Sequence, residues 1–354
     1  MANPMVNTWG RDMFPLCVLK LSRSRRNLIR RAAMFGVLAA LNSLAMPAVA
    51  DTAVVGMLPK FTSDPYFVAA NKGAQQAASE LGITVEFNGP VDASVAAQTD
   101  IIDRWIRRRV SAIAVSANDP NALAPAMRRA AAAGIKVMTW DADVLQDARA
   151  VFLNQASFAA IGKTLVDMMA RTAGTTRGNF LIITAVLTAP NQNRWIDELR
   201  KYAAEAYPGM RIAAVLSGDD DLEKSKNVTL NYLQANPDTK GVFSVTGIAT
   251  PGIVEAIKEL GLVGKVAVAG LGVPSLIRPY LKDGSLREAT LWNPVDIGYA
   301  AIYIVNAQLK NTLNPRSGYV DAGRLGKLKF ISNDTVLLGE PLIFSKNNID
   351  QFNF

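Results

Sequence analysis

The stretch Met57-Leu-Pro-Lys-Phe-Thr-Ser-Asp-Pro-Tyr-Phe67 joins an apolar run, residues 53–58, to an amphipathic pattern. Asp64 followed by Pro65 is typical of a helix start, because the aspartate can accept from free amides and proline has no N–H to leave unpaired. Apolar residues then recur at three- and four-residue spacing until Gly82, which predicts a helix that ends there. In an open parallel sheet such a connection lies at the carboxyl edge of the strands, where ligands bind. It carries four candidate ligand groups, Lys60, Asp64, Tyr66 and Phe67.

The same alternation of strand and helix continues along the chain. Near-continuous apolar strands between amphipathic helices indicate parallel sheets covered on both faces. The pattern predicts two consecutive α/β units with a boundary near residues 151–155, where no Gly/Pro spacer occurs. Further strands are expected at 84–87, 112–116 and 136–139 in the first unit, and at 180–185, 212–216, 242–245, 266–269 and 286–291 in the second.

Composition excludes several classes of function. Residues 1–50 hold seven of the 38 basic and one of the 30 acidic residues, so the remaining 304 carry 31 basic and 29 acidic residues and are nearly neutral. That balance argues against a nucleic-acid partner held by phosphate charge. The chain has no histidine, and its one cysteine is Cys17, so residues 51–354 offer no thiol nucleophile, disulfide or imidazole ligand.

The first 50 residues have the pattern of an export signal. A basic region, residues 22–31, precedes an apolar region, 32–44, that is short for a membrane span, and Ala48-Val-Ala50 is a small-residue cleavage signal. We expect cleavage before Asp51 and a periplasmic protein. Ser24–Arg30 also resembles a twin-arginine signal, so both the Sec and the twin-arginine routes stay open.

Polar and aromatic clusters follow five of the predicted strands. If each unit is a parallel sheet, these clusters converge on one cleft between two lobes. They are the Lys60–Phe67 stretch, Trp140-Asp141-Ala-Asp143, Asn191-Gln192-Asn-Arg-Trp195, Thr246-Gly247 and Trp292-Asn293.

The chemistry of these groups suits a polyhydroxylated small molecule. A carboxylate such as Asp141 accepts hydroxyl hydrogens, Lys60 only donates, and side-chain amides such as that of Gln192 do both. A phosphate would require more cations or a glycine-rich loop. Flat rings that can pack on the C–H faces of a sugar come from Tyr66, Phe67, Trp140 and Trp292.

Each candidate also has a purely structural interpretation. Asp64 is first of all a helix cap, Asp141 can cap a turn, and Phe67 lies on the buried stripe of its helix. Lys60 taken alone would be a solvated surface lysine, and Asn191-Gln192 could be the ordinary polar start of a helix. Trp195 could pack its helix, and Trp292 could belong to the core.

Catalysis has little support in the sequence. Without histidine or cysteine, acid–base work would depend on Lys60 or on Asp141 and Asp143, and only if both carboxylates faced the cleft. No serine elbow, phosphate-binding loop or metal-ligand spacing occurs. We therefore expect neither an enzyme nor a cofactor or metal.

Several uncommon strings resemble one family over residues 51–354. They are Val137-Met-Thr-Trp-Asp-Ala-Asp143, Leu165-Val-Asp-Met168, Gln192-Asn-Arg-Trp195, Arg278-Pro-Tyr280, Leu291-Trp292 and Asn348–Phe354. With the Ser63–Phe67 stretch, they resemble the type I periplasmic sugar-binding proteins of ABC importers, most closely the autoinducer-2-binding and rhamnose-binding proteins. The resemblance implies two Rossmann-like lobes with parallel sheets, joined by a three-crossing hinge. After the expected signal peptide at 1–50, we expect an N-terminal lobe at 51–152 plus 294–325 and a C-terminal lobe at 153–293 plus 326–354.

The resemblance also implies ligand-binding positions. Lys60, Asp141 and Gln192 match those of the autoinducer-2 binders, whereas three positions differ: Asn191 stands in place of an aspartate, Val245 in place of a proline and Gly247 in place of an alanine. These differences favour rhamnose or a similar sugar or polyol over autoinducer-2 itself. The implied role is a monomeric binding protein that delivers its ligand to a membrane permease.

Three other functions have discriminating features. The same module can present a sugar or autoinducer-2 to a chemoreceptor or membrane kinase, which the sequence does not separate from import. A sugar-responsive repressor would need a helix-turn-helix where residues 1–50 carry a leader instead. A hydrolase would need Asp141 and Asp143 to act together.

Overall fold

The computed structural model describes residues 52–354 except residue 93. The predicted signal peptide and its cleavage site before Asp51 lie outside these residues. Residues 52–354 form one compact unit built around two sheets. No helix in this part of the chain is both long and apolar enough to cross a bilayer.

The first sheet has eight strands in the order β11-β12-β13-β5-β4-β3-β1-β2. Strands β1 to β5 and β13 run parallel, whereas β11 and β12 extend the sheet antiparallel at one end. The strands are β1 Val54–Leu58, β2 Thr84–Phe87, β3 Ala112–Val115, β4 Lys136–Trp140, β5 Val151–Asn154, β11 Tyr319–Asp321, β12 Lys327–Ser332 and β13 Thr335–Leu337.

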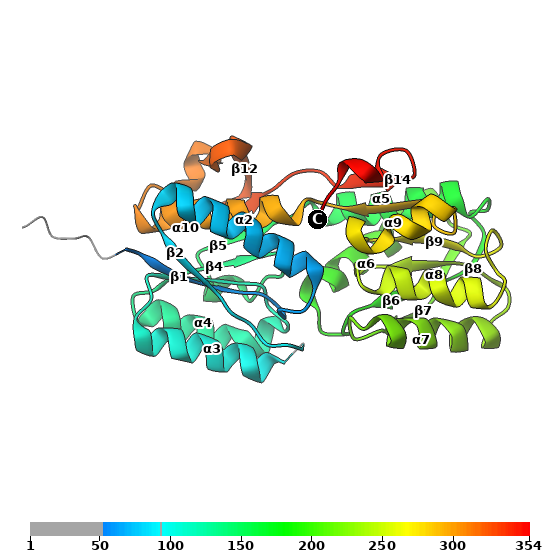
Figure 1. The fold of residues 1–354 in the computed structure, drawn as a ribbon, viewed down its shortest axis with the longest axis horizontal. Coiled ribbons are helices and arrows are strands. Elements are labelled where there is room, and N and C mark those ends of the chain that lie inside the picture. Colours follow the sequence, from blue (N-terminus) through cyan, green and yellow to red (C-terminus); the bar gives the residue numbers. More distant parts are fainter. Residues whose placement is uncertain (1–51, 93) are drawn as a thin grey trace, which may run out of the picture. The chain divides into compact units, whose positions relative to one another are not determined.

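Helices cover both faces of this sheet, as the continuous apolar strands require. Helices α2 (Pro65–Leu81) and α10 (Pro294–Leu309) lie on one face, and α3 (Val95–Arg108) and α4 (Pro120–Ala132) on the other (Figure 1). The predicted helix start is confirmed, because Asp64 caps α2 by accepting from the Tyr66 amide at 2.8 Å. Gly82 closes the helix with φ 65°.

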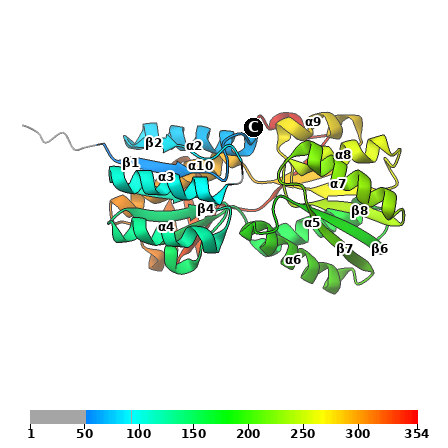
Figure 2. The same ribbon diagram turned by 90° about the horizontal axis from the view of Figure 1, so that it is seen from below.

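The second sheet is parallel, in the order β7-β6-β8-β9. Its strands are β6 Gly178–Thr184, β7 Met210–Ser217, β8 Thr239–Ser244 and β9 Ala267–Gly270. An antiparallel pair, β10 (Glu288–Leu291) with β14 (Leu342–Ser345), is joined to β9 by a bridge from Thr290 to Leu271. Figure 2 shows strands β6 to β8 between two helical layers, built from α5 Phe158–Thr172, α6 Pro190–Ala206, α7 Leu222–Ala235, α8 Ala249–Glu259 and α9 Pro274–Asp283.

Three connections join the sheets, each only a few residues long. They follow β5, β10 and β13, at residues 155–157, 292–293 and 338–341. The predicted fold class, two α/β lobes with a three-crossing hinge, is confirmed. We call the first sheet with its helices the first lobe, and the second sheet with its helices the second lobe.

The expected lobe boundaries need correction at two places. Residues 326–354 were assigned to the second lobe, but β12 and β13 belong to the first sheet, where β13 pairs with β5. Strand β5 itself also extends past the expected boundary at residue 152. The reason is tertiary: the edge of β5 is free to accept a strand, and nothing in the local pattern of residues 327–337 says which sheet it joins.

Two glycines let α2 and α10 lie in direct backbone contact. A Cβ added at Gly73 would fall 1.8 Å from the Val295 carbonyl oxygen, and one at Gly298 would fall 1.8 Å from that of Ala70. This contact fixes α2, which begins beside Tyr66, against α10, which begins just after Trp292. The packing therefore holds two aromatic residues of the site in register.

Candidate functional site

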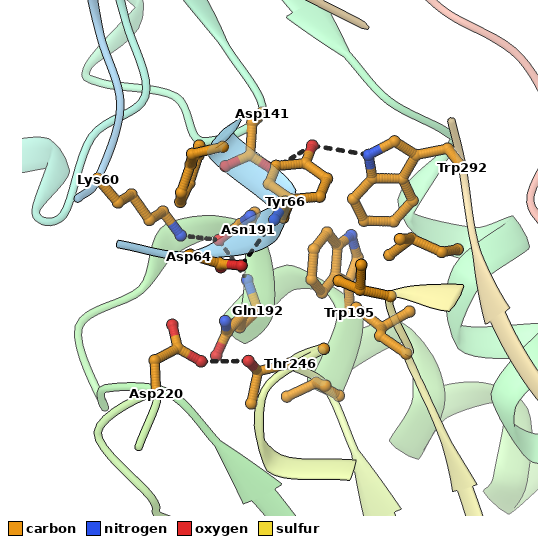
Figure 3. Close-up of a pocket in the computed structure, with 16 residues that line it drawn as sticks. Lys60, Asp64, Tyr66, Asp141, Asn191, Gln192, Trp195, Asp220, Thr246 and Trp292 are labelled. Atoms are coloured by element: carbon orange, nitrogen blue, oxygen red, sulfur yellow. Dashed lines mark hydrogen bonds between the residues drawn. The ribbon is translucent and has the colours of Figure 1, made fainter. Parts of the chain in front are cut away.

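A cavity lies where the carboxyl ends of the strands of both sheets face each other (Figure 3). Its empty volume, about 430 Å³, includes space that is open to solvent. Sixteen residues line the cavity, and they include one lysine and three aspartates. The lining is Lys60, Asp64, Tyr66, Phe67, Asp141, Asn191, Gln192, Trp195, Asp220, Val245, Thr246, Gly247, Leu271, Val273, Leu291 and Trp292.

Lys60 reaches across the cavity from the first lobe to the second. Its Nζ donates to Asn191 Oδ1 at 3.0 Å, and the side chain is 6% exposed. The loop that carries it is fixed from behind, because Asn118 Nδ2 donates to the Lys60 carbonyl at 2.9 Å and Gln98 Nε2 donates to the Pro59 carbonyl at 2.9 Å. Lys60 is therefore a positioned donor and not a solvated lysine.

Asp141 is the first residue after β4 and has φ 62°. Aspartate tolerates this left-handed conformation better than most residues. Ser116 Oγ donates to Oδ2 at 2.7 Å, while Tyr66 OH and Gln155 Nε2 donate to Oδ1 at 3.3 and 3.4 Å. Burial raises the pKa of Asp141, although the Lys60 charge and the hydroxyl donors of Ser116 and Tyr66 act in the opposite direction.

Tyr66 links Asp141 to the crossing segment at Trp292. Its hydroxyl donates to Asp141 and accepts from Trp292 Nε1 at 2.7 Å. Burial and the Asp141 charge raise the pKa of Tyr66 well above its ordinary value, so it is a neutral hydroxyl at physiological pH. The tyrosine is therefore placed as a fixed hydrogen-bonding wall of the cavity.

Asp64 is both a helix cap and part of the cavity lining. One oxygen accepts from the Tyr66 amide, and the residue is half-buried. Burial, followed by the charge of Asp220, raises the pKa of Asp64 to about 7. The two interpretations of this residue are thus compatible.

The second lobe contributes the first turn of α6. Gln192 Oε1 accepts from Thr184 Oγ1 at 2.5 Å and from the Ala185 amide at 2.8 Å, which directs its Nε2 donors away from the sheet. Asn191 Oδ1 accepts from Lys60 and from the Gln192 amide at 3.0 Å. Val245 and Gly247 line the cavity in the loop after β8.

Aromatic rings form one wall. The Trp195 and Trp292 ring centroids lie 5.6 Å apart, and those of Tyr66 and Trp292 lie 6.0 Å apart at 86°. Phe67 also lines the cavity. Trp195 was expected only to pack its helix; it is 2% exposed and lines the cavity, and its Nε1 donor has no partner among the described residues.

Two predicted site residues do not line this cavity. Trp140 is fully buried behind Phe67, with ring centroids 5.7 Å apart, and its Nε1 donates to the Ala114 carbonyl at 3.3 Å. Asp143 forms an ion pair with Arg149 at 2.8 Å. The left-handed turn at Asp141 sends the following residues in another direction, so Asp141 and Asp143 are not a carboxylate pair in the cleft.

Sequence reasoning missed Asp220 altogether and did not select Thr246 from its cluster. Asp220 lies in the loop after β7 with φ 48°, and Thr246 Oγ1 donates to it (Figure 3). Burial raises the pKa of Asp220, with smaller opposing effects from Thr246 and Lys60. The rule that ligand groups follow parallel strands would have found it, because Gly218-Asp-Asp-Asp221 follows a predicted strand.

Comparison with known proteins agrees with this architecture. Residues 55–313 match the model of the periplasmic binding protein domain. The D-allose-binding periplasmic protein of Escherichia coli (strain K12) is 24% identical over 269 residues, which are 73% of this chain and 84% of that protein.

Two solved structures are similar over most of both chains. LsrB from Clostridium saccharobutylicum in complex with AI-2 is 27% identical with a TM-score of 0.80, covering 85% of this chain and 100% of that one. A solute-binding protein of an ABC transporter from Clostridium phytofermentas with bound L-rhamnose is 29% identical with a TM-score of 0.79, covering 86% and 98%.

Proposed function

The chain belongs to the periplasmic binding protein family, and from that membership we propose that it is the substrate-binding component of an ABC importer. Its ligand is a monosaccharide-like molecule, rhamnose or a similar sugar or polyol, with autoinducer-2 as a further candidate. The residues of the site are Lys60, Asp64, Tyr66, Phe67, Asp141, Asn191, Gln192, Val245, Gly247 and Trp292.

One observation carries the proposal: polar groups from both lobes and an aromatic wall share a single cavity. Hydroxyl groups can donate to Asp141 and accept from Lys60 and from Gln192 Nε2. The rings of Tyr66 and Trp292 offer flat apolar surface for the C–H faces of a sugar. Similar proteins whose structures contain AI-2 and L-rhamnose support a small, polar ligand.

The bond from Lys60 to Asn191 suggests how the ligand is held. It joins the two lobes, and such a contact exists only when they are close together. Three short crossings allow a hinge motion, and a ligand that touches both lobes stabilises the closed form by its additional contacts there. The lobes that move are residues 52–154 with 294–337, and residues 158–291 with 342–354.

Localisation and partners follow from the same proposal. The periplasmic relatives and the leader-like residues 1–50 support export to the periplasm, by the Sec or the twin-arginine route. The binding protein is a monomer that delivers its ligand to a permease in the inner membrane. We expect the role to be binding without catalysis, and we expect the site to need no metal or cofactor.

A thermal-shift panel followed by calorimetry tests the proposal. L-Rhamnose, D-allose, D-ribose, other pentoses, polyols and autoinducer-2 are added to the mature protein, because a ligand that binds only the folded state raises its melting temperature. At least one should raise it with a saturable dose dependence, and Gln192→Leu should weaken that binding. A panel without any binder would contradict the proposal.

A further inference from the structure

The charges lining the cavity are unequal. Three carboxylates, those of Asp64, Asp141 and Asp220, line it, and of the described residues only Lys60 brings a positive charge to the lining. The ion pairs formed within residues 52–354 include none of these four. Lys60 donates to the neutral amide of Asn191. Lys60 and Asp141 are buried, and Asp64 and Asp220 are half-buried. Charges withdrawn from water are ordinarily paired, so this arrangement favours a further positive charge or a proton.

The three carboxylates differ in how many acceptor positions are filled. Asp141 accepts from three side chains, of Ser116, Tyr66 and Gln155. Asp64 accepts from one backbone amide and Asp220 from one side-chain hydroxyl. A carboxylate offers about four lone-pair positions, so the free acceptor capacity is concentrated on Asp64 and Asp220.

Asp64 and Asp220 come from different lobes and line the same cavity, where the charge of Asp220 acts on Asp64. After burial, the Asp220 charge is the strongest influence that raises the pKa of Asp64. Two like charges brought together as lobes close oppose the closure unless something neutralises them. An ammonium group does so, and its three donors can reach acceptor positions left free on both carboxylates.

We propose that the cavity binds a small polyhydroxylated molecule that carries one amino group, with the ammonium between Asp64 of the first lobe and Asp220 of the second. The inference rests on the proposed function, because it keeps the same cavity and narrows the class of ligand to amino sugars and amino polyols. The rest of the lining fits hydroxyl groups. Lys60 and Gln192 Nε2 donate, and the unpartnered Trp195 Nε1, 2% exposed in the cavity wall, requires an acceptor atom.

The test compares ligands that differ only in the amino group. Calorimetry at pH 7.5 measures glucosamine with glucose, galactosamine with galactose, 1-amino-1-deoxysorbitol with sorbitol, and 1-amino-1-deoxyribitol with ribitol. In at least one pair the amine should bind tenfold or more tightly than its parent. Asp220→Asn should weaken that amine tenfold or more while the parent binds equally well or better.

A matched control comes from the same loop. Asp219 also has a positive φ, 53°, but it is exposed and pairs with Lys224 outside the cavity. Asp219→Asn should leave both members of each pair unchanged. Asp64→Asn, which retains a good helix cap, is a second variant that should repeat the effect of Asp220→Asn even if the latter unfolds.

The outcomes separate this inference from the proposed function. If parents bind as well as their amines in every pair that binds, the amino-group inference is wrong and the sugar-binding proposal stands. In that case the protein should take up a proton when the neutral ligand binds, and the measured binding enthalpy should vary with the ionisation enthalpy of the buffer. If neither these compounds nor the neutral panel binds, both are wrong.

Discussion

Replacing Asp141 with asparagine should change affinity and stability in opposite directions. Asparagine has nearly the same shape and tolerates φ 62°, so the substitution removes the charge with little strain. Hydrogen bonds to a charged group contribute about 1.5–3 kcal/mol, so the dissociation constant of the cognate ligand should rise about 10- to 150-fold.

The stability of the ligand-free protein should rise or stay level. Because burial raises the pKa of Asp141, the folded state favours the protonated carboxyl. The stability from this group is therefore present below its unfolded pKa and is lost as pH rises through the higher folded pKa. Above the unfolded pKa this group therefore costs stability, and Asp141→Asn removes that cost. Asp141→Ala would weaken binding similarly but add left-handed strain.

Calorimetry and urea denaturation at pH 7 measure the two effects, and Asp143→Asn is the control. Asp143 lies outside the cavity and pairs with Arg149, whose side chain is only 5% exposed. Asp143→Asn should lower the free energy of unfolding by about 1–3 kcal/mol, a modest loss because Asp334 still pairs with Arg149. It should leave the affinity for the ligand unchanged. If Asp141→Asn instead destabilised the protein and bound ligand normally, Asp141 would be a turn residue and the assignment of the site would be refuted.

Three further changes test other parts of the structure. Gly73→Ala places a methyl 1.8 Å from the Val295 carbonyl oxygen and should lower the free energy of unfolding by about 2–3 kcal/mol in urea denaturation. Gly82→Ala, where space is open, should lower it by about 1 kcal/mol, and equal losses would contradict the helix contact. Trp195→Phe should weaken ligand binding about fivefold, because a hydrogen bond contributes about 1 kcal/mol, and it should not lower the melting temperature of the free protein. Unchanged affinity would show that the ligand does not accept a hydrogen bond from Trp195 Nε1. Because the pKa of Asp64 is raised to about 7, its ionisation costs stability as pH rises from 4 to 8, and the melting temperature of Asp64→Asn should rise relative to that of the parent protein over this range. A difference that stays constant with pH would contradict the raised pKa.

The predictable parts of this molecule depend on local chemistry. The start of α2 follows from Asp64 and Pro65, because capping involves only neighbouring residues. Lys60, Asp141 and Gln192 were predicted because parallel strands bring their carboxyl ends to one edge. That rule needs only the strand positions, which the apolar runs supply.

The parts that were missed depend on backbone direction or tertiary context. Asp143 was paired with Asp141 by spacing, but the positive φ at Asp141 separates them. Helical periodicity placed Trp195 in the packing of α6, and a side chain can pack there and still face the cavity. Asp220 sits in a run of aspartates that has the composition of an ordinary solvated loop.

The position of β13 has a consequence for the order in which the chain matures. β5 pairs along one edge with β4 and along the other with β13, which arrives about 180 residues later. As a ribosome or a secretion channel delivers the polypeptide from its N-terminus, that second edge has no neighbour until almost the whole chain has emerged. The half made first is thus among the last to be completed, and a nascent chain stalled before residue 335 would expose a bare strand to chaperones, proteases or another copy of itself.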